Sequence, residues 1–313
     1  MELATVRGRM RRIPLSIAAL LLLSLTVLAA ASATSPAPPP PPGPPARPDA
    51  QAQPSNLSAS ILDSTLLVTW YGNPWSSRMG ILGRLEPDAL AAGLKKQAAE
   101  YAAVTSKRVT PAYELVAIVG QPQPGRDGVY RRRESYQVID RMLHAARAAG
   151  FKLILDVQTG HSSVLAELSY LAPFLQQPDV YVALDPEFSM GNGAIPGQRI
   201  GQMFADDVND AIDVLECVQE HYRLPRKVLM VHQFTMAMLP DKEKIWSSST
   251  VDIVLVADGF GPPALKRHTY AMVLKQHALA FSGFKLFYIQ DTDLLQPAQV
   301  MALTPPPSVI IYQ

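Results

Sequence analysis

The sequence predicts an α/β fold, a single (β/α)8 barrel of the TIM type, from three observations. After a non-globular N-terminal stretch, about 255 of the 313 residues remain, which is the usual size of one such barrel. In that part, short apolar runs alternate with helical stretches, which indicates parallel strands joined by crossover helices. The apolar runs number eight, and eight parallel strands favour closure into a barrel.

Each predicted strand is a short run rich in branched and aromatic residues and bounded by turn formers. In chain order the strands are expected at residues 66–71, 112–118, 152–157, 180–184, 227–231, 252–257, 285–289 and 308–312.

The predicted helices carry recognisable start and stop signals. Pro87 and Pro262 suit first helical turns, and Gly150 follows a helix where a left-handed residue is wanted. Asp206 and Asp207 favour a helix N-terminus. Helices are expected at residues 87–103, 134–149, 163–176, 206–222, 262–279 and 297–303, with a less regular piece around 236–245.

The alternative fold is an open, doubly wound parallel sheet, but no glycine-rich phosphate loop follows the first predicted strand. The sequence ends at Gln313, directly after the eighth predicted strand, so the eighth helix of the barrel is expected to be missing. Residues 56–64 are expected to cover that part of the barrel wall in its place.

The N-terminal region predicts export. Arg7 to Arg12 form a basic segment, residues 13–30 are apolar, and Ala31-Ser32-Ala33 has the small residues that signal peptidase accepts. We expect a signal peptide at 1–33, a Pro/Ala-rich extended linker at 34–55 and the barrel domain at 56–313, on the extracellular side as a secreted or cell-envelope protein. The apolar segment also permits an uncleaved membrane anchor.

Composition narrows the partners. A formal net charge of +1 with 18% charged residues shows no basic surface for nucleic acid, and we expect a monomer. Cys217 is the single cysteine and no His-rich ligand motif occurs, so neither a zinc site nor any other cofactor is predicted. A hard cation bound by carboxylate oxygens stays open as an alternative, through Glu114, Asp156, Asp185, Glu187 and Asp258.

Polar side chains gather at the carboxyl ends of the predicted strands, where α/β barrels build their active sites. The opposite ends mostly carry Lys or Asp residues, namely Lys152, Lys227, Asp252 and Lys285. The polar residues at the carboxyl ends are Tyr71, Glu114, Asp156, Gln158, Asp185, Glu187, His232, Gln233, Asp258, Gln290, Asp291 and Asp293.

The strongest motif is Asp185-Pro186-Glu187 at the end of the fourth predicted strand. Strand alternation puts both acids on one face, their Cα atoms about 6.6 Å apart. Two carboxyl groups that close tend to hold one proton between them, which suits paired acid and base roles. The alternative is structural, with one acid capping a loop or pairing with Arg199.

An Asp-x-Glu motif on strand four of an exported barrel resembles the catalytic motif of barrel glycoside hydrolases, notably the family 25 lysozymes. The chain as a whole is also similar to exported bacterial barrel proteins of no assigned activity. The glycosidase resemblance implies that Glu187 is the proton donor and that its partner carboxylate is on strand seven, where Asp291 or Asp293 stands. For a hydrolase we expect Glu187 as the acid and Asp185 or Asp291 as the base or stabiliser.

Aromatic residues near the same rim suit sugar rings, although plain barrel packing is the alternative. Tyr71 and especially Trp75, in a loop rich in Gly, Pro and Ser, are candidate platforms. The predicted function is an extracellular glycoside hydrolase acting on a poly- or oligosaccharide. The alternative is a non-catalytic carbohydrate-binding or envelope scaffold protein. Substrate-binding residues are expected to be Tyr71, Trp75, Glu114, Asp156, Gln158, His232, Gln233, Asp258, Gln290 and Asp293.

Overall fold

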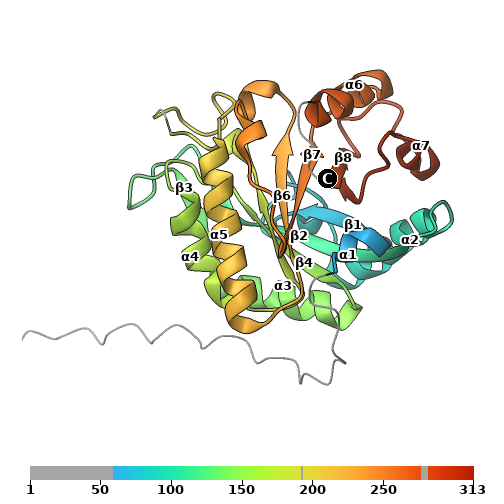
Figure 1. Cartoon of the computed structure of the whole chain (residues 1–313), viewed down its shortest axis with the longest axis horizontal. Coiled ribbons are helices and arrows are strands. Elements are labelled where there is room, and N and C mark those ends of the chain that lie inside the picture. Colours follow the sequence, from blue (N-terminus) through green and yellow to red (C-terminus); the bar gives the residue numbers. More distant parts are fainter. Residues whose placement is uncertain (1–58, 192, 276–280) are drawn as a thin grey trace, which may run out of the picture. The chain divides into compact units, whose positions relative to one another are not determined.

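The computed structural model describes residues 59–191, 193–275 and 281–313 (Figure 1). The expected signal peptide, and the expected linker at 34–55, lie outside these residues. Within the described ranges, the helices are too short or too polar to cross a bilayer.

Eight parallel strands close into a barrel in the described part of the chain. Each strand pairs with its neighbours in parallel, and the first strand pairs with both the second and the last, which closes the sheet. The predicted (β/α)8 fold is therefore confirmed. The barrel strands are β1 (Thr65–Gly72), β2 (Arg108–Gly120), β4 (Lys152–Val157), β5 (Val180–Leu184), β6 (Lys227–Gln233), β7 (Val251–Ala257), β8 (Phe281–Leu286) and β9 (Val309–Tyr312).

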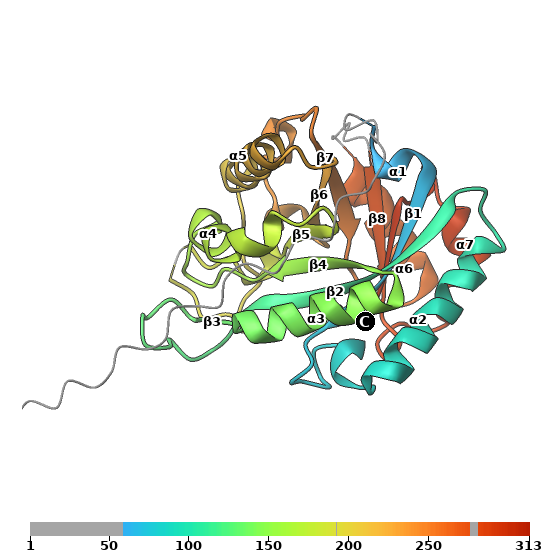
Figure 2. The same ribbon diagram turned by 90° about the horizontal axis from the view of Figure 1, so that it is seen from below.

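Helices lie around the outside of the strands (Figure 2). Pro87 stands in the first turn of its helix, and Gly150 ends another helix with a φ of 79°, as their positions in the sequence predict. The long helices are α2 (Pro87–Ala102), α3 (Tyr136–Ala149), α4 (Val164–Leu175), α5 (Ala205–Tyr222) and α6 (Pro263–Leu274). Shorter elements are α7 (Pro297–Met301) and the 3-10 turns Ile81–Gly83, Pro186–Phe188, Met236–Met238 and Lys242–Lys244.

Alternate side chains of the strands fill the barrel interior. The described part of the segment expected to cover the barrel wall, residues 59–64, lies elsewhere, so that prediction was wrong. Leu62, in α1 (Ile61–Ser64), is fully buried among interior residues such as Leu67 and Val228. Because α1 directly precedes the first strand, it closes the amino-terminal end of the barrel rather than covering its wall.

The wall at β9 and β1 is covered by helices that flank those strands in the chain. α2 and α7 lie side by side there (Figure 2). The hydroxyl groups of Tyr101 in α2 and Tyr312 in β9 are hydrogen-bonded at 2.9 Å. A buried hydrogen bond thus ties α2 to β9 in this part of the wall.

Two elements differ from the sequence-based expectation. The seventh barrel strand, β8, lies four residues earlier than the start predicted at 285, which moves Lys285 from the amino end of the strand to its carboxyl end. A short strand, β3 (Arg131–Arg133), pairs antiparallel with the end of β2. Arg131 and Arg133 of β3 both hydrogen-bond the buried carboxylate of Glu167, which makes this basic run structural.

Candidate active site

A cavity of about 590 Å³ opens at the carboxyl ends of the strands, where barrel active sites are built. Its walls are partly aromatic, from Tyr71, Phe188, Phe234, Phe260 and Phe287. Its charged lining residues are Arg78, Asp185, Glu187, Asp258 and Lys285. A cavity of this size encloses a small organic molecule.

Asp185 and Glu187 both line this cavity. Asp185 follows β5, and its side chain is only 3% exposed. Nε2 of Gln158 donates to Oδ2 of Asp185 at 3.1 Å, whereas Oδ1 has no hydrogen-bond partner. Glu187 lies in the 3-10 turn Pro186–Phe188 and is half-buried. The turn, rather than a continued strand, delivers Glu187 to the more open part of the cavity.

Lys285 is a buried cation that the sequence-based reasoning did not place at this site. Its Nζ lies 3.1 Å from Oδ2 of Asp258 and 3.9 Å from the centre of the Tyr71 ring. The residue is 3% exposed, yet it lines the cavity. An ammonium group is therefore fixed at the bottom of the cavity by one carboxylate and one aromatic face.

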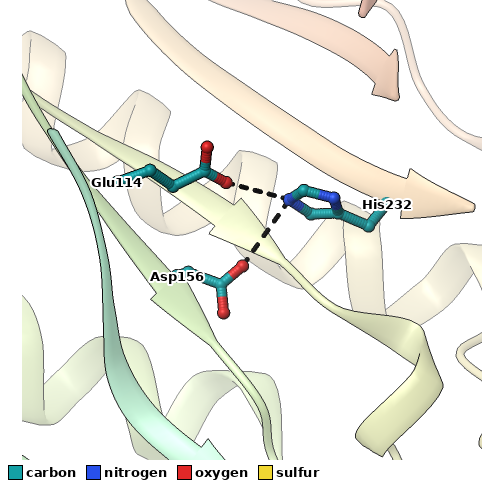
Figure 3. A group of neighbouring side chains, drawn as sticks. All are labelled: Glu114, Asp156 and His232. Carbon is teal, nitrogen blue, oxygen red and sulfur yellow. Dashed lines mark hydrogen bonds and ion pairs between the residues drawn. The ribbon is translucent and has the colours of Figure 1, made fainter. Parts of the chain in front are cut away.

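Beneath the cavity lies a fully buried cluster of Glu114, Asp156 and His232 (Figure 3). Nε2 of His232 lies 3.0 Å from Oε1 of Glu114 and 3.6 Å from Oδ2 of Asp156. On the other side of the ring, Nδ1 lies 3.0 Å from Oδ2 of Asp258. Asp258 thus contacts both His232 and Lys285 and joins the buried cluster to the cavity.

The environment sets the protonation of these groups. Burial, together with the charges of Asp185 and Asp258, raises the pKa of Glu187 to about 7. Burial likewise raises the pKa of Asp185, although the nearby positive charge of His232 opposes the shift. Burial and the charge of Asp185 raise the pKa of Asp156 well above its ordinary value. Near neutral pH Glu187 therefore exchanges a proton, and Asp185 and Asp156 each hold a proton to higher pH than an ordinary aspartate does.

Burial acts on the pKa values of the basic groups in the opposite direction, but the neighbouring carboxylates outweigh it. Burial lowers the pKa of Lys285, but the charges of Asp258 and Asp185 outweigh burial, so the pKa is raised. Burial also lowers the pKa of His232, yet contacts with Asp258 and Glu114 raise it well above its ordinary value. Burial raises the pKa of Asp258, but Lys285 and His232 lower it by more, so Asp258 remains ionised. The cavity floor holds a permanent ammonium–carboxylate pair.

Several residues predicted for the site lie elsewhere. Asp291 accepts hydrogen bonds from the backbone of Gly261 and Phe287 and pairs with Lys266 at 3.0 Å, so it does not line the cavity. Asp293 is exposed outside the cavity. These positions follow from the earlier end of β8, because residues 290–293 lie in the loop beyond it.

Two further predicted residues also lie away from the cavity. Trp75 is 60% exposed and lines a separate groove with Arg141, whose guanidinium lies 5.7 Å from the ring centre. Gln233 is buried and receives a hydrogen bond from Nζ of Lys242. The cavity does collect the predicted residues Tyr71, Gln158, Asp185, Glu187, Asp258 and Gln290, with Glu114, Asp156 and His232 beneath it.

Comparison with known proteins gives structural likenesses only. No protein-family model matches the chain, and no curated protein matches it. A 2,3-dimethylmalate lyase of the PEP mutase/isocitrate lyase superfamily is 11% identical, with a TM-score of 0.45 over 82% of this chain and 77% of the other. An oxaloacetate acetylhydrolase is 12% identical, with a TM-score of 0.44 over 80% and 77%. A GH18 chitinase from Pseudoalteromonas aurantia is 11% identical, with a TM-score of 0.37 over 78% and 92%.

The prediction of a polysaccharide-acting glycoside hydrolase, with its sugar-binding alternative, is therefore corrected. Among the similar structures named above, the 2,3-dimethylmalate lyase and the oxaloacetate acetylhydrolase have higher TM-scores than the GH18 chitinase. Of the two residues expected as the second catalytic carboxylate, Asp185 lines the cavity, whereas Asp291 is held by Lys266 outside it. The expected aromatic platform, Trp75, lies in another groove.

Proposed function

We propose that the chain is an enzyme that transfers a proton at a carbon atom next to a carbonyl group, with Glu187 as the base and Lys285 as the stabiliser of the resulting enolate. The observation that carries this proposal is that both side chains line one cavity. Enolate formation is the step common to carbonyl isomerases and to lyases that break carbon–carbon bonds.

Glu187 has the properties of an acid–base catalyst. A proton-transfer group works best when its pKa is near the working pH, and the pKa of Glu187 is raised to about 7. The carboxyl group is half-buried beside the cavity, so it is reachable by a substrate and still partly shielded from water. An ordinary surface glutamate would be a weaker base at this pH.

Lys285 supplies the complementary charge. When a carbon atom loses a proton to Glu187, the C–H electron pair forms a C=C bond and the carbonyl electron pair moves to oxygen. A fixed ammonium group beside that oxygen stabilises the new negative charge without reorganising. Because Asp258 holds the Nζ atom at 3.1 Å, the ammonium is in place before the substrate arrives.

The charge of Lys285 argues against an imine mechanism. A lysine attacks a carbonyl carbon only as the neutral amine. The charges of Asp258 and Asp185 raise the pKa of Lys285, which keeps the amine protonated. Treatment with borohydride in the presence of a carbonyl substrate is therefore expected to leave the mass of the chain unchanged. A covalent adduct on Lys285 would replace this proposal with an imine mechanism.

The charge balance also restricts the substrate. Carboxylates outnumber cations on the cavity floor and beneath it, where Glu114 and Asp156 add to Asp185, Glu187 and Asp258. Because burial and crowding already raise the pKa values of Asp156, Asp185 and Glu187, a further negative charge placed beside these acids is disfavoured. Neutral hydroxyketones and hydroxyaldehydes fit the cavity, with their carbon skeletons against Phe188 and Phe234.

The test is hydrogen exchange in D2O. The full chain is incubated with neutral hydroxyketones and hydroxyaldehydes, and loss of the proton next to the carbonyl is followed by ¹H NMR. We expect exchange above the buffer rate with the wild type and a loss of about 100-fold or more with Glu187→Gln. Exchange equal in both proteins, or none with the wild type, would reject the proposal. Glu243→Gln, at an acid outside the cavity, is the matched control.

Export, the absence of a nucleic-acid partner and a monomeric state remain predictions from the sequence. They are compatible with an enzyme that acts on a small molecule outside the cell. Fractionation of the expressing cell, with the chain and its cavity variants followed in each fraction, tests whether the protein is exported.

A further inference from the structure

We propose that Glu114, Asp156 and His232 bind one divalent transition-metal cation beneath the active-site cavity. This inference goes beyond the proposed function and does not depend on it. It rests on three features of the cluster: the separation of its ligand atoms, the lack of partners for Asp156, and the crowding of buried carboxyl groups.

Two of the ligand-atom separations are close to those that a metal requires. Carboxylate oxygen and imidazole nitrogen bind Zn²⁺ at about 2.0–2.2 Å, so atoms that share a tetrahedral or octahedral ion lie about 3.0–3.5 Å apart. Nε2 of His232 lies 3.0 Å from Oε1 of Glu114 and 3.6 Å from Oδ2 of Asp156. All three ligand atoms lie within 4.8 Å of one another. A cation fits among them with small side-chain shifts.

Asp156 is the observation that points to a missing ligand. The residue is fully buried, and neither of its carboxylate oxygens has a hydrogen-bond partner. Its only contact of opposite charge in the cluster is the 3.6 Å approach to His232, and its side chain is aimed at that ring (Figure 3). A buried carboxylate without donors is costly, so the fold keeps Asp156 at the expense of stability. A metal ion supplies the missing partner.

The acids that surround the cluster favour a metal cation between Glu114 and Asp156 rather than another hydrogen-bond donor. Five carboxyl groups meet in this region, on Glu114, Asp156, Asp185, Glu187 and Asp258. The described residues offer Lys285 and His232 against them, and Lys285 is already committed to Asp258. A divalent ion next to Glu114 and Asp156 would allow both acids to be buried as carboxylates.

His232 is held as a metal-binding imidazole usually is. A ligating histidine presents one ring nitrogen to the metal and directs the other to a carboxylate, which fixes the orientation of the ring. Here Nε2 faces Glu114 and Asp156, and Nδ1 lies 3.0 Å from Oδ2 of Asp258. Thr69 further orients Glu114, because its hydroxyl donates to Oε2 at 3.0 Å and leaves Oε1 for the ion.

The ligand set indicates the type of ion. Two carboxylates and one imidazole suit Zn²⁺ or Mn²⁺, whereas Ca²⁺ and Mg²⁺ prefer oxygen ligands alone. Because the cluster lies beneath the cavity floor, a bound ion would strengthen the positive potential that acts on the substrate oxygen.

The test measures metal binding without any substrate, so its outcome is separate from that of the proposed function. The full chain, carrying no polyhistidine tag, is stripped with EDTA and titrated with Zn²⁺ by calorimetry. We expect one tight site per chain, weakened by about 100-fold or more in Asp156→Asn. Asp127→Asn, which removes an exposed carboxylate, is expected to bind zinc like the wild type. No tight site, or equal binding by the wild type and Asp156→Asn, would overturn the inference.

Thermal unfolding tests whether Asp156→Asn loses zinc binding only because the variant does not fold. Without metal, Asp156→Asn is expected to melt at or above the wild-type temperature, because an unsatisfied buried acid has been removed. Zinc at 100 times its Kd should raise the Tm of the wild type by about 5 °C or more and leave that of Asp156→Asn unchanged. A zinc-induced rise of equal size in both proteins would contradict the assignment. With Mn²⁺ bound to the wild type, electron spin echo envelope modulation should show coupling to one imidazole nitrogen, that of His232.

Discussion

Replacing Lys285 by Met tests whether the buried ammonium is an essential partner of Asp258. The substitution keeps most of the apolar volume and removes the Nζ atom that lies 3.1 Å from Oδ2 of Asp258. Asp258 is 7% exposed, so water cannot fully replace the lost partner. Removing one member of a buried ion pair costs about 3–5 kcal/mol.

The expected loss lies at the lower end of that range, because Asp258 keeps its contact with His232 at 3.0 Å. We therefore predict that Lys285→Met lowers the free energy of unfolding by about 3 kcal/mol in urea at pH 7. At about 2–4 °C per kcal/mol for a domain of this size, Tm falls by about 6–12 °C. The proton-exchange rate of the folded variant falls by about 100-fold, because the enolate oxygen loses its ammonium partner.

Two variants make the measurement specific. Lys244→Met removes an exposed ammonium that pairs with Asp241 at 3.6 Å, and its effect should stay within about 0.5 kcal/mol. Adding Asp258→Asn to Lys285→Met removes the unpaired charge, so the double variant should regain about 1–3 kcal/mol of the loss expected from the two single changes. A loss under about 1 kcal/mol for Lys285→Met would refute the reasoning.

Two other predictions concern the pH dependence and the closed end of the barrel. The kcat/KM for proton exchange should rise as pH increases through about 7, because Glu187 acts as a base only when it is deprotonated. Asp258→Asn should move this rise to lower pH, because it removes a charge that raises the pKa of Glu187. A profile that is flat from about pH 5 to 8 would exclude Glu187 as the base. Leu62→Ala should lower the free energy of unfolding by about 2–5 kcal/mol, because it empties space inside the barrel, whereas Leu85→Ala, at a residue 43% exposed, should cost under about 1 kcal/mol in the same urea titration.

The fold was predictable because the barrel repeats one simple pattern. Fully buried parallel strands read as continuous apolar runs, as in β5 and β7, and their turn signals separate them clearly. The same logic predicted the carboxyl-end positions of Asp156 and Asp258, because these acids stand near the ends of apolar runs. Glu114 lies in the middle of β2 instead, which is why it is beneath the cavity.

The seventh strand was misplaced because its pattern is weak. β8 begins Phe281-Ser282-Gly283, and a sequence window prefers the apolar run that follows Lys285. Gly283 lies so close to Val256 that a Cβ atom would stand 2.8 Å from a valine methyl group, so packing requires the residue that weakens the strand signal. This shift placed Lys285 at the wrong end of the strand and Asp291 in the site.

The buried cluster could not be predicted from the spacing of its residues in the sequence. Glu114, Asp156 and His232 come from β2, β4 and β6, and only barrel closure brings their side chains to one point. No short motif marks such a group, because its members are far apart in the chain. The signal that was available is an acid or histidine inside each of these apolar strands, near the end of β4 and β6 and in the middle of β2.

The most direct test of the account is the titration of Glu187 itself. The side-chain carboxyl carbon is labelled with ¹³C, and its resonance is assigned by its absence in Glu187→Gln. We predict a midpoint near pH 7, because burial and the charges of Asp185 and Asp258 oppose ionisation. A midpoint near about 4.3, the ordinary value for glutamate, would contradict the claim that this cavity makes Glu187 a base for proton transfer.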